Sequence, residues 1–181
     1  ANKLSNFSKV KKDLINVYFD EGREYSVPYQ FGTTAFMVDT AVYGGDINTL
    51  DILFNPPAEL KGKINMFRDV NDVINAALRY KGYETCNANR KELKEVNDML
   101  KTASENWLSI QSDGAREMLV SGDAAVSMVW NGMALRARQE KASLQYAYPK
   151  EGLTAWADNL VVLKDAPNLE NAKLFLNFMM E

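Results

Sequence analysis

Five side chains in the sequence have the types and spacing needed to bind an organic cation. Asp69 and Asp72 lie three residues apart, Trp156 and Asp158 lie two apart, and Trp130 directly precedes an Asn-Gly pair. Carboxylates take up ammonium charge and accept its hydrogen bonds, while indole rings cover methylene groups and add cation–π attraction. These five are therefore the candidate ligand-binding residues. Such binding needs no catalytic residue, no metal ion and no cofactor, and none of these is predicted.

The Asp69 and Asp72 pair has two interpretations, which are compatible. An Asp at a helix N-cap with a second acid three residues later resembles a capping box and suits the positive end of the helix dipole. The same spacing places both carboxylates near one face of the first helical turn. A cap uses one carboxylate oxygen and leaves the other free. The pair could therefore also form an anionic site for an organic cation.

The two tryptophans also have a structural alternative. Trp130 follows an apolar run and precedes a turn, so it is either an ordinary core residue or a ring that faces a cleft. Trp156 and Asp158 point to the same face if their segment is extended. An indole face beside a carboxylate is a suitable receptor for an alkylammonium group.

Alternating strands and helices are predicted to position these residues. Apolar runs predict strands at residues 31–38, 63–67, 124–130, 144–147 and 159–163. A period of 3.6 residues predicts helices at residues 70–81, 91–107, 114–120, 131–141 and 169–179, the last with Asn168 as N-cap. This order predicts an α/β fold with a mostly parallel central sheet and helices on both faces. Ligands bind at the carboxyl ends of strands in such sheets, which points to the segments after residues 67, 130 and 156.

Composition excludes several classes of function. The 181 residues carry 21 Lys and Arg against 24 Asp and Glu, a net charge of −3 that argues against a nucleic-acid-binding protein. The absence of histidine removes the Ser-His and Cys-His nucleophile pairs and most zinc and iron sites. One cysteine, Cys86, allows no internal disulfide and no multi-cysteine metal site. The predicted function is binding and not catalysis.

One enzymatic alternative stays open. Asp69 and Asp158 could act as a carboxylate pair of the kind that glycosidases use. No other residue in the sequence supports hydrolysis.

Several ordered segments resemble the spermidine/putrescine-binding proteins of bacterial polyamine ABC transporters, a family of extracellular solute-binding proteins. The resemblance spans nearly the whole chain. The segments that carry it are Lys3–Phe7, Tyr25–Ala35, Ala77–Tyr83, Met128–Gly132, Tyr148–Gly152 and Trp156–Asp158.

The resemblance implies a type II periplasmic-binding-protein-like lobe. Residues 1–181 correspond to the second, C-terminal-type lobe of a two-lobed Venus-flytrap receptor, with the first lobe and the C-terminal tail absent. The sequence ends inside an expected helix, which also indicates a piece of a longer protein. The implied function is capture of a putrescine-like or spermidine-like polyamine in the periplasm for an ABC transporter permease.

The resemblance also assigns roles to the candidate residues. It implies that Asp69 and Asp72 bind amine groups, that Trp130 and Trp156 flank the methylene chain, and that Asp158 anchors an amine. Two departures bear on the ligand. Asp72 is shorter than the Glu of some relatives, and Arg68 adds a positive charge beside the acidic pair. Another small organic cation, an opine or an amino-acid derivative is therefore an alternative ligand. A second alternative is that the isolated lobe self-associates as a homodimer through its uncovered apolar face.

Overall fold

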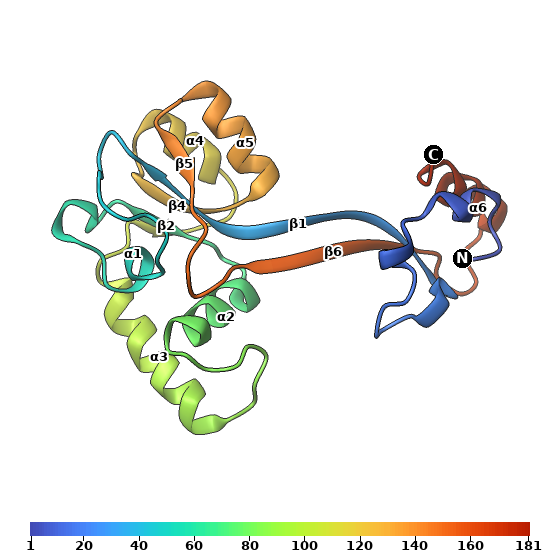
Figure 1. Cartoon of the computed structure of the whole chain (residues 1–181), viewed down its shortest axis with the longest axis horizontal. Helices are drawn as coiled ribbons and strands as arrows, with labels where there is room; N and C mark the ends of the chain where they lie inside the picture. The colour runs from blue at the N-terminus through green and yellow to red at the C-terminus, as the bar shows by residue number, and fades with distance from the viewer. The chain divides into compact units, whose positions relative to one another are not determined.

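The computed structural model describes all 181 residues and divides the chain into two compact units. Unit 1 comprises Ala1–Phe31 and Trp156–Glu181, and unit 2 comprises Gly32–Ala155. Strands β1 (Ser26–Asp39) and β6 (Thr154–Val161) pair with each other, and each has residues in both units (Figure 1). No helix combines the length and the apolar composition that crossing a bilayer requires.

Unit 2 is built on a mixed sheet with the strand order β3-β2-β4-β1-β5. The bounds of the remaining strands are β2 Ile64–Met66, β3 Ser109–Ile110, β4 Val126–Trp130 and β5 Leu144–Tyr146. Strand β2 is parallel to β3 and β4, whereas β1 is antiparallel to β4 and β5. The predicted α/β class is confirmed, but the sheet is mixed where a mostly parallel one was expected. A strand buried on both faces has the same apolar pattern in either direction, so its sequence does not reveal its direction.

Helices cover this sheet. Their bounds are α1 Asp51–Phe54, η4 Ala58–Leu60, α2 Val70–Tyr80, α3 Arg90–Ser104, α4 Ala115–Ser121 and α5 Asn131–Glu140. Helix α4 packs against α5 and β4, and α2 packs against α3. Within unit 2, Figure 1 shows these two groups of helices on opposite sides of β2 and β4. The predicted helices are confirmed with small shifts at their ends.

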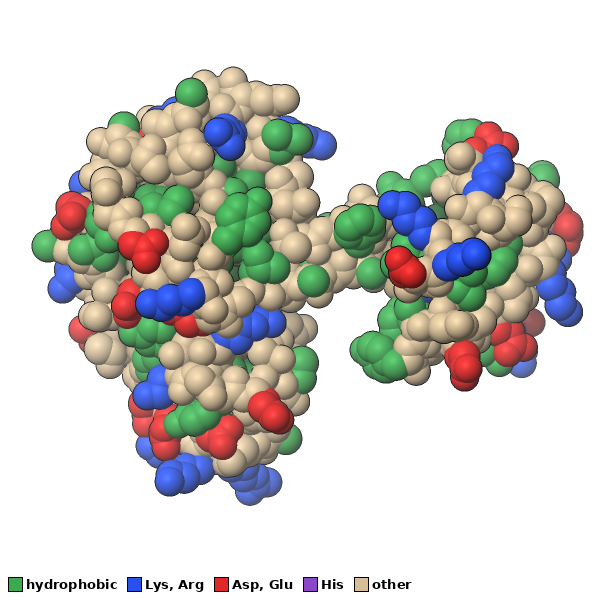
Figure 2. All heavy atoms as spheres, viewed as in Figure 1, with side chains coloured by type: hydrophobic (Ala, Val, Ile, Leu, Met, Phe, Trp, Pro, Cys, Tyr) green, Lys and Arg blue, Asp and Glu red, His purple; other side chains and the backbone are tan.

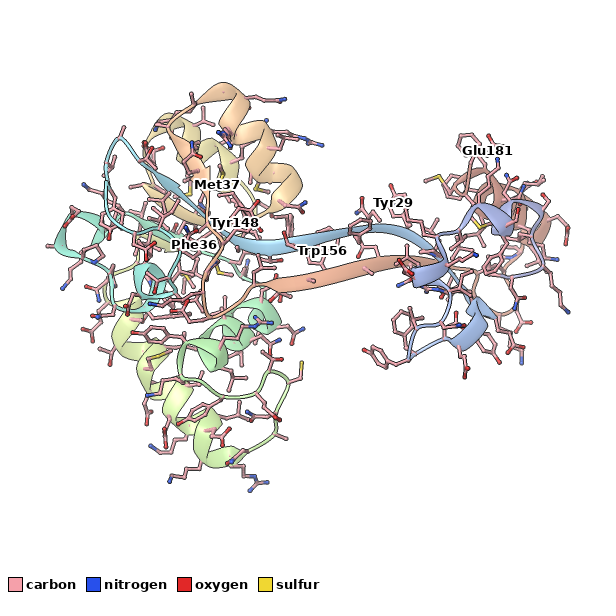
Figure 3. All side chains as sticks on the ribbon, in the orientation of Figure 1. Tyr29, Phe36, Met37, Tyr148, Trp156 and Glu181 are labelled. Atoms are coloured by element: carbon pink, nitrogen blue, oxygen red, sulfur yellow. The ribbon has the colours of Figure 1, made fainter.

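The core of unit 2 runs through β1. Three consecutive residues of this strand, Phe36, Met37 and Val38, are fully buried, and Figure 3 labels the first two. Successive strand residues face opposite sides of a sheet, so β1 must be covered on both faces. Tight packing on both faces makes this strand a rigid base for the side chains at its ends.

Unit 1 has a much smaller core, with Val27, Leu176 and Met180 as its buried apolar residues. Its helical segments are η1 Ser5–Lys9, η2 Lys12–Leu14, η3 Glu21–Arg23 and α6 Leu169–Phe178. Asn6 joins η1 to α6, because its backbone N–H donates to Asn177 Oδ1 and its Nδ2 donates to Asn177 O, both at 2.9 Å. Helix α6 begins where predicted, but the Asn168 side chain makes no capping bond. The strand expected at 159–163 begins earlier, at Thr154.

Candidate functional site

Asp69 caps helix α2 as its spacing predicted. Its Oδ1 accepts a hydrogen bond from the backbone N–H of Asp72 at 3.0 Å, and its own backbone is extended. This bond satisfies one of the N–H groups that a helix start leaves free. The cap leaves the Asp72 carboxylate available for other contacts.

The Asp69 cap gives a first testable prediction. Asp69→Ala is expected to lower the free energy of unfolding by about 1 kcal/mol, because the N–H of Asp72 loses its partner. Asp69→Ser keeps a capping oxygen and should stay within a few tenths of a kcal/mol of the wild type. Urea unfolding of the three proteins checks this. Equal losses in the Ala and Ser variants would contradict a capping role.

Asp72 is a half-buried carboxylate in unit 2. Burial is the largest influence and raises its pKa above the usual value, because it disfavours the charged form. The Thr34 hydroxyl opposes this shift, the charge of Asp69 adds to it, and Thr154 and Arg79 act to lower the pKa. A partly desolvated carboxylate interacts more strongly with a bound cation than a fully hydrated one does.

A small cavity of about 10 Å³ lies beside Asp72 and is also lined by Thr34, Arg79 and Thr154. Arg79 Nη1 donates to Thr154 Oγ1 at 3.2 Å, which holds the guanidinium in place. Thr34 is buried, and its hydroxyl lowers the pKa of the Asp72 carboxyl by hydrogen bonding to it. The surroundings of Asp72 are therefore polar although the carboxylate is half-buried.

Trp130 is the last residue of β4 and is 40% exposed. Its ring contacts Phe67 with a centroid separation of 5.1 Å. Trp130 ends β4 and Phe67 directly follows β2, so the two rings meet at the carboxyl ends of adjacent parallel strands. Thr34, whose hydroxyl influences Asp72, is the partner of Trp130 in the β1–β4 register. Trp130 is thus a partly exposed ring that packs against Phe67, and it is not a buried core residue.

Two tyrosines that the sequence analysis did not single out lie in the same region. Tyr146 Oη lies 3.0 Å from Thr33 Oγ1, and its ring meets Tyr148 edge-on at 5.4 Å. Burial raises the pKa of Tyr146, and the charge of Asp72 adds to this shift. Tyr148 is 68% exposed and is labelled in Figure 3. The alternation of these tyrosines at the end of β5 was visible in the sequence, but the pairing of β5 with β1 was not.

The remaining two candidates lie on β6 in unit 1, whose extended backbone meets the condition for Trp156 and Asp158 to point to the same face. Residue 156 lies inside β6, so the expectation that a strand ends there was wrong. Asp158 is exposed and accepts a hydrogen bond from Gln30 Nε2 at 2.9 Å. Trp156 is half-buried, and its Nε1 has no hydrogen-bond partner (Figure 3). Asp69, Asp72 and Trp130 thus all belong to unit 2, where Thr34 pairs with Trp130 and influences Asp72. Trp156 and Asp158 lie on one strand of unit 1.

The chain matches a known family along its full length. Residues 1–181 match the family described as "Bacterial extracellular solute-binding protein". The chain is 33% identical over 180 residues to the spermidine/putrescine-binding periplasmic protein of Escherichia coli (strain K12). This alignment covers 99% of the chain and 51% of that protein, so the chain spans about half the length of the curated relatives it matches.

Solved structures show the same fold. A structure described as a spermidine/putrescine ABC transporter from Listeria monocytogenes has a TM-score of 0.91 and 29% identity, covering 99% of this chain and 55% of that one. The spermidine/putrescine ABC transporter substrate-binding protein PotD of Streptococcus pneumoniae has a TM-score of 0.81 and 25% identity, with coverage of 99% and 55%. The chain therefore belongs to the bacterial extracellular solute-binding protein family, a family of binding proteins and not a class of enzymes.

Proposed function

We propose that this chain is part of the substrate-capture component of an ABC import system and binds a polyamine such as putrescine or spermidine. The observation that carries the proposal is the half-buried Asp72 carboxylate, whose neighbour Thr34 is the strand partner of the partly exposed Trp130. Relatives named for spermidine and putrescine binding support the choice of ligand. Their names also support a periplasmic location and a permease as partner.

Each candidate residue has a defined task in this proposal. Asp72 and Asp69 bind one ammonium group, and Trp130 covers adjacent methylene groups. Trp156 and Asp158 repeat the combination of ring and carboxylate on β6. All of these are binding steps, and the proposed function includes no catalysis.

We further propose that residues 1–181 form the second lobe of a two-lobed protein, with a first lobe completing it. Unit 1 supports this, because its core is small and it contains a cavity of about 260 Å³. Figure 2 shows hydrophobic side chains at the surface of this unit. Its exposed large hydrophobic residues are Tyr18, Phe19, Tyr25, Tyr29, Phe31, Val161, Leu163, Leu169, Leu174, Phe175 and Phe178. Exposed apolar side chains in this number support a partner surface that covers unit 1.

Titration of the three tryptophan indole N–H signals by NMR tests polyamine binding. Putrescine and spermidine are expected to shift the Trp130 and Trp156 signals at millimolar concentrations, because the isolated chain supplies only part of the contacts. Trp107 is an internal control, since its Nε1 is already bonded to Leu53 O at 2.8 Å. 1,4-Butanediol has the same carbon chain without charge and should leave all three signals unchanged. Equal shifts with the diol would contradict recognition of an amine.

Two alternatives are separated by further measurements. An opine or an amino-acid derivative could shift the Trp130 and Trp156 signals at a lower concentration than putrescine does. The ligand would then belong to that class instead, and the proposed role as a receptor would be unchanged.

Light scattering across a range of concentrations tests self-association through unit 1. A strict monomer at high concentration would remove the homodimer.

A further inference from the structure

Gln30 on β1 is the hydrogen-bond partner of Asp158 on β6. Its Nε2 donates to Asp158 Oδ2 at 2.9 Å, and both side chains are exposed and belong to unit 1. The two strands are paired, so the two side chains that make this contact project from neighbouring strands. This geometry restricts where the carboxylate points without burying it.

The chemistry of this contact leaves two acceptors open. A carboxylate accepts hydrogen bonds only, so Gln30 must present its NH₂ group to Asp158, and its carbonyl Oε1 is left out of the contact. The second carboxylate oxygen, Oδ1, is also outside this bond. The amide of Gln30 is neutral, so it does not offset the charge of a carboxylate as a lysine or arginine partner would. The pair therefore offers one charge and two separate acceptor oxygens.

We propose that Gln30 is a positioning and specificity residue that acts with Asp158 to select a primary ammonium group. A primary ammonium has three N–H donors, enough to serve both Asp158 Oδ1 and Gln30 Oε1. A trimethylammonium group carries the same charge but has no donor for either oxygen. This inference rests on the proposed function, and it narrows the ligand class to amines with free –NH₃⁺ ends.

Substitution of Gln30 tests the selectivity. Putrescine and its fully N-methylated analogue, tetramethylene-bis(trimethylammonium), are titrated against the wild type and Gln30→Met, which keeps the length of the side chain without its amide. We expect Gln30→Met to weaken putrescine binding about tenfold, the usual effect of losing a hydrogen bond to a charged group. Binding of the methylated analogue should change less than twofold. Gln139→Met, an exposed change on α5 in unit 2, is the matched control and should alter neither.

Other outcomes overturn the inference. A merely structural role for Gln30 would weaken both ligands by the same factor, and an irrelevant contact would weaken neither. Absence of putrescine binding by the wild type would remove the proposed function itself.

The hydrogen bond between Gln30 and Asp158 can be tested without ligand by NMR. The side-chain amide signals of Gln30 should shift on acidification in the wild type and lose that response in Asp158→Asn. Gln30 amide signals that do not change on acidification would refute the positioning role.

Discussion

Replacing Asp72 with asparagine is expected to weaken polyamine binding roughly 10- to 100-fold, because the variant loses a charge-assisted hydrogen bond in a partly desolvated site. The same substitution should make unit 2 more stable at pH 7. Burial raises the pKa of Asp72, so its ionised form is less favourable in the folded protein than in the unfolded chain. A residue that improves binding while lowering stability is typical of a functional position.

The pH dependence of Asp72 follows from the direction of its pKa shift. The folded-state pKa lies above the ordinary value of 3.8, so the folded protein binds more protons between the two values. Stability therefore falls as the pH rises through this window, and Asp72→Asn should abolish that fall. The groups that influence this titration include Asp69, Arg79, Thr34 and Thr154.

Calorimetric titration with putrescine checks the loss of affinity in Asp72→Asn. Thermal unfolding at pH 3 and pH 7 checks its gain in stability. Asp72→Asn should have a higher midpoint temperature than the wild type at pH 7 and nearly the same one at pH 3. Asp113→Asn, an exposed substitution in unit 2, is the control and should change neither affinity nor stability. Unchanged affinity in Asp72→Asn would exclude this carboxylate from the site.

The second large effect is expected at the end of β1, where Asp39 and Lys141 form an ion pair. Lys141 Nζ lies 2.7 Å from Asp39 Oδ2, and the Asp39 side chain is only 4% exposed. Burial raises the pKa of Asp39, but hydrogen bonds from Lys141, Ser143 and the Ala41 N–H more than offset this, so its pKa lies below the usual value. Lys141→Met should lower the free energy of unfolding by about 3 kcal/mol at pH 7, because it leaves a buried charge without its partner.

The loss in Lys141→Met should depend on pH with a definite sign. A carboxylate whose folded-state pKa is lowered stabilises the protein above its unfolded pKa of 3.8, and this contribution is lost as the pH falls through the folded value. The difference between variant and wild type should therefore shrink as the pH falls below 3.8 in urea unfolding.

Lys94→Met is the matched control for this prediction. Lys94 and Asp98 form a pair with the same 2.7 Å separation, but their side chains are 77% and 52% exposed. Exposed pairs of this kind contribute little to stability, because water and salt screen their charges. Similar losses in Lys94→Met and Lys141→Met would contradict the importance of burial.

Local features of the fold could be predicted from the sequence. The Asp69 cap and the helix that follows it depend on residues within one helical turn of each other, and both are confirmed. The position of Trp130 at the end of a strand also follows from a short-range pattern. The strand predicted at residues 159–163 instead begins at Thr154 and includes Trp156 and Asp158. Family membership follows from ordered motifs, because these keep their spacing along the chain.

The tertiary structure decided which distant side chains meet. Thr33 and Tyr146 are 113 residues apart, and Gln30 and Asp158 are 128 apart, yet each pair is in hydrogen-bond contact. The antiparallel direction of β1 brings β5 beside it and creates the first of these contacts. Strand direction does not alter the pattern of buried residues, so no periodicity in the sequence reports it.

The charge state of the site was likewise outside the reach of sequence reasoning. Asp69 and Asp72 are the same residue type in the sequence. In the structure, Asp69 caps a helix at the surface, whereas Asp72 is half-buried near Thr34 and Arg79. The spacing of the acids determined that a helix starts there. Only packing determined which acid is desolvated, because desolvation depends on all the groups that surround a carboxylate and not on its neighbours in the chain.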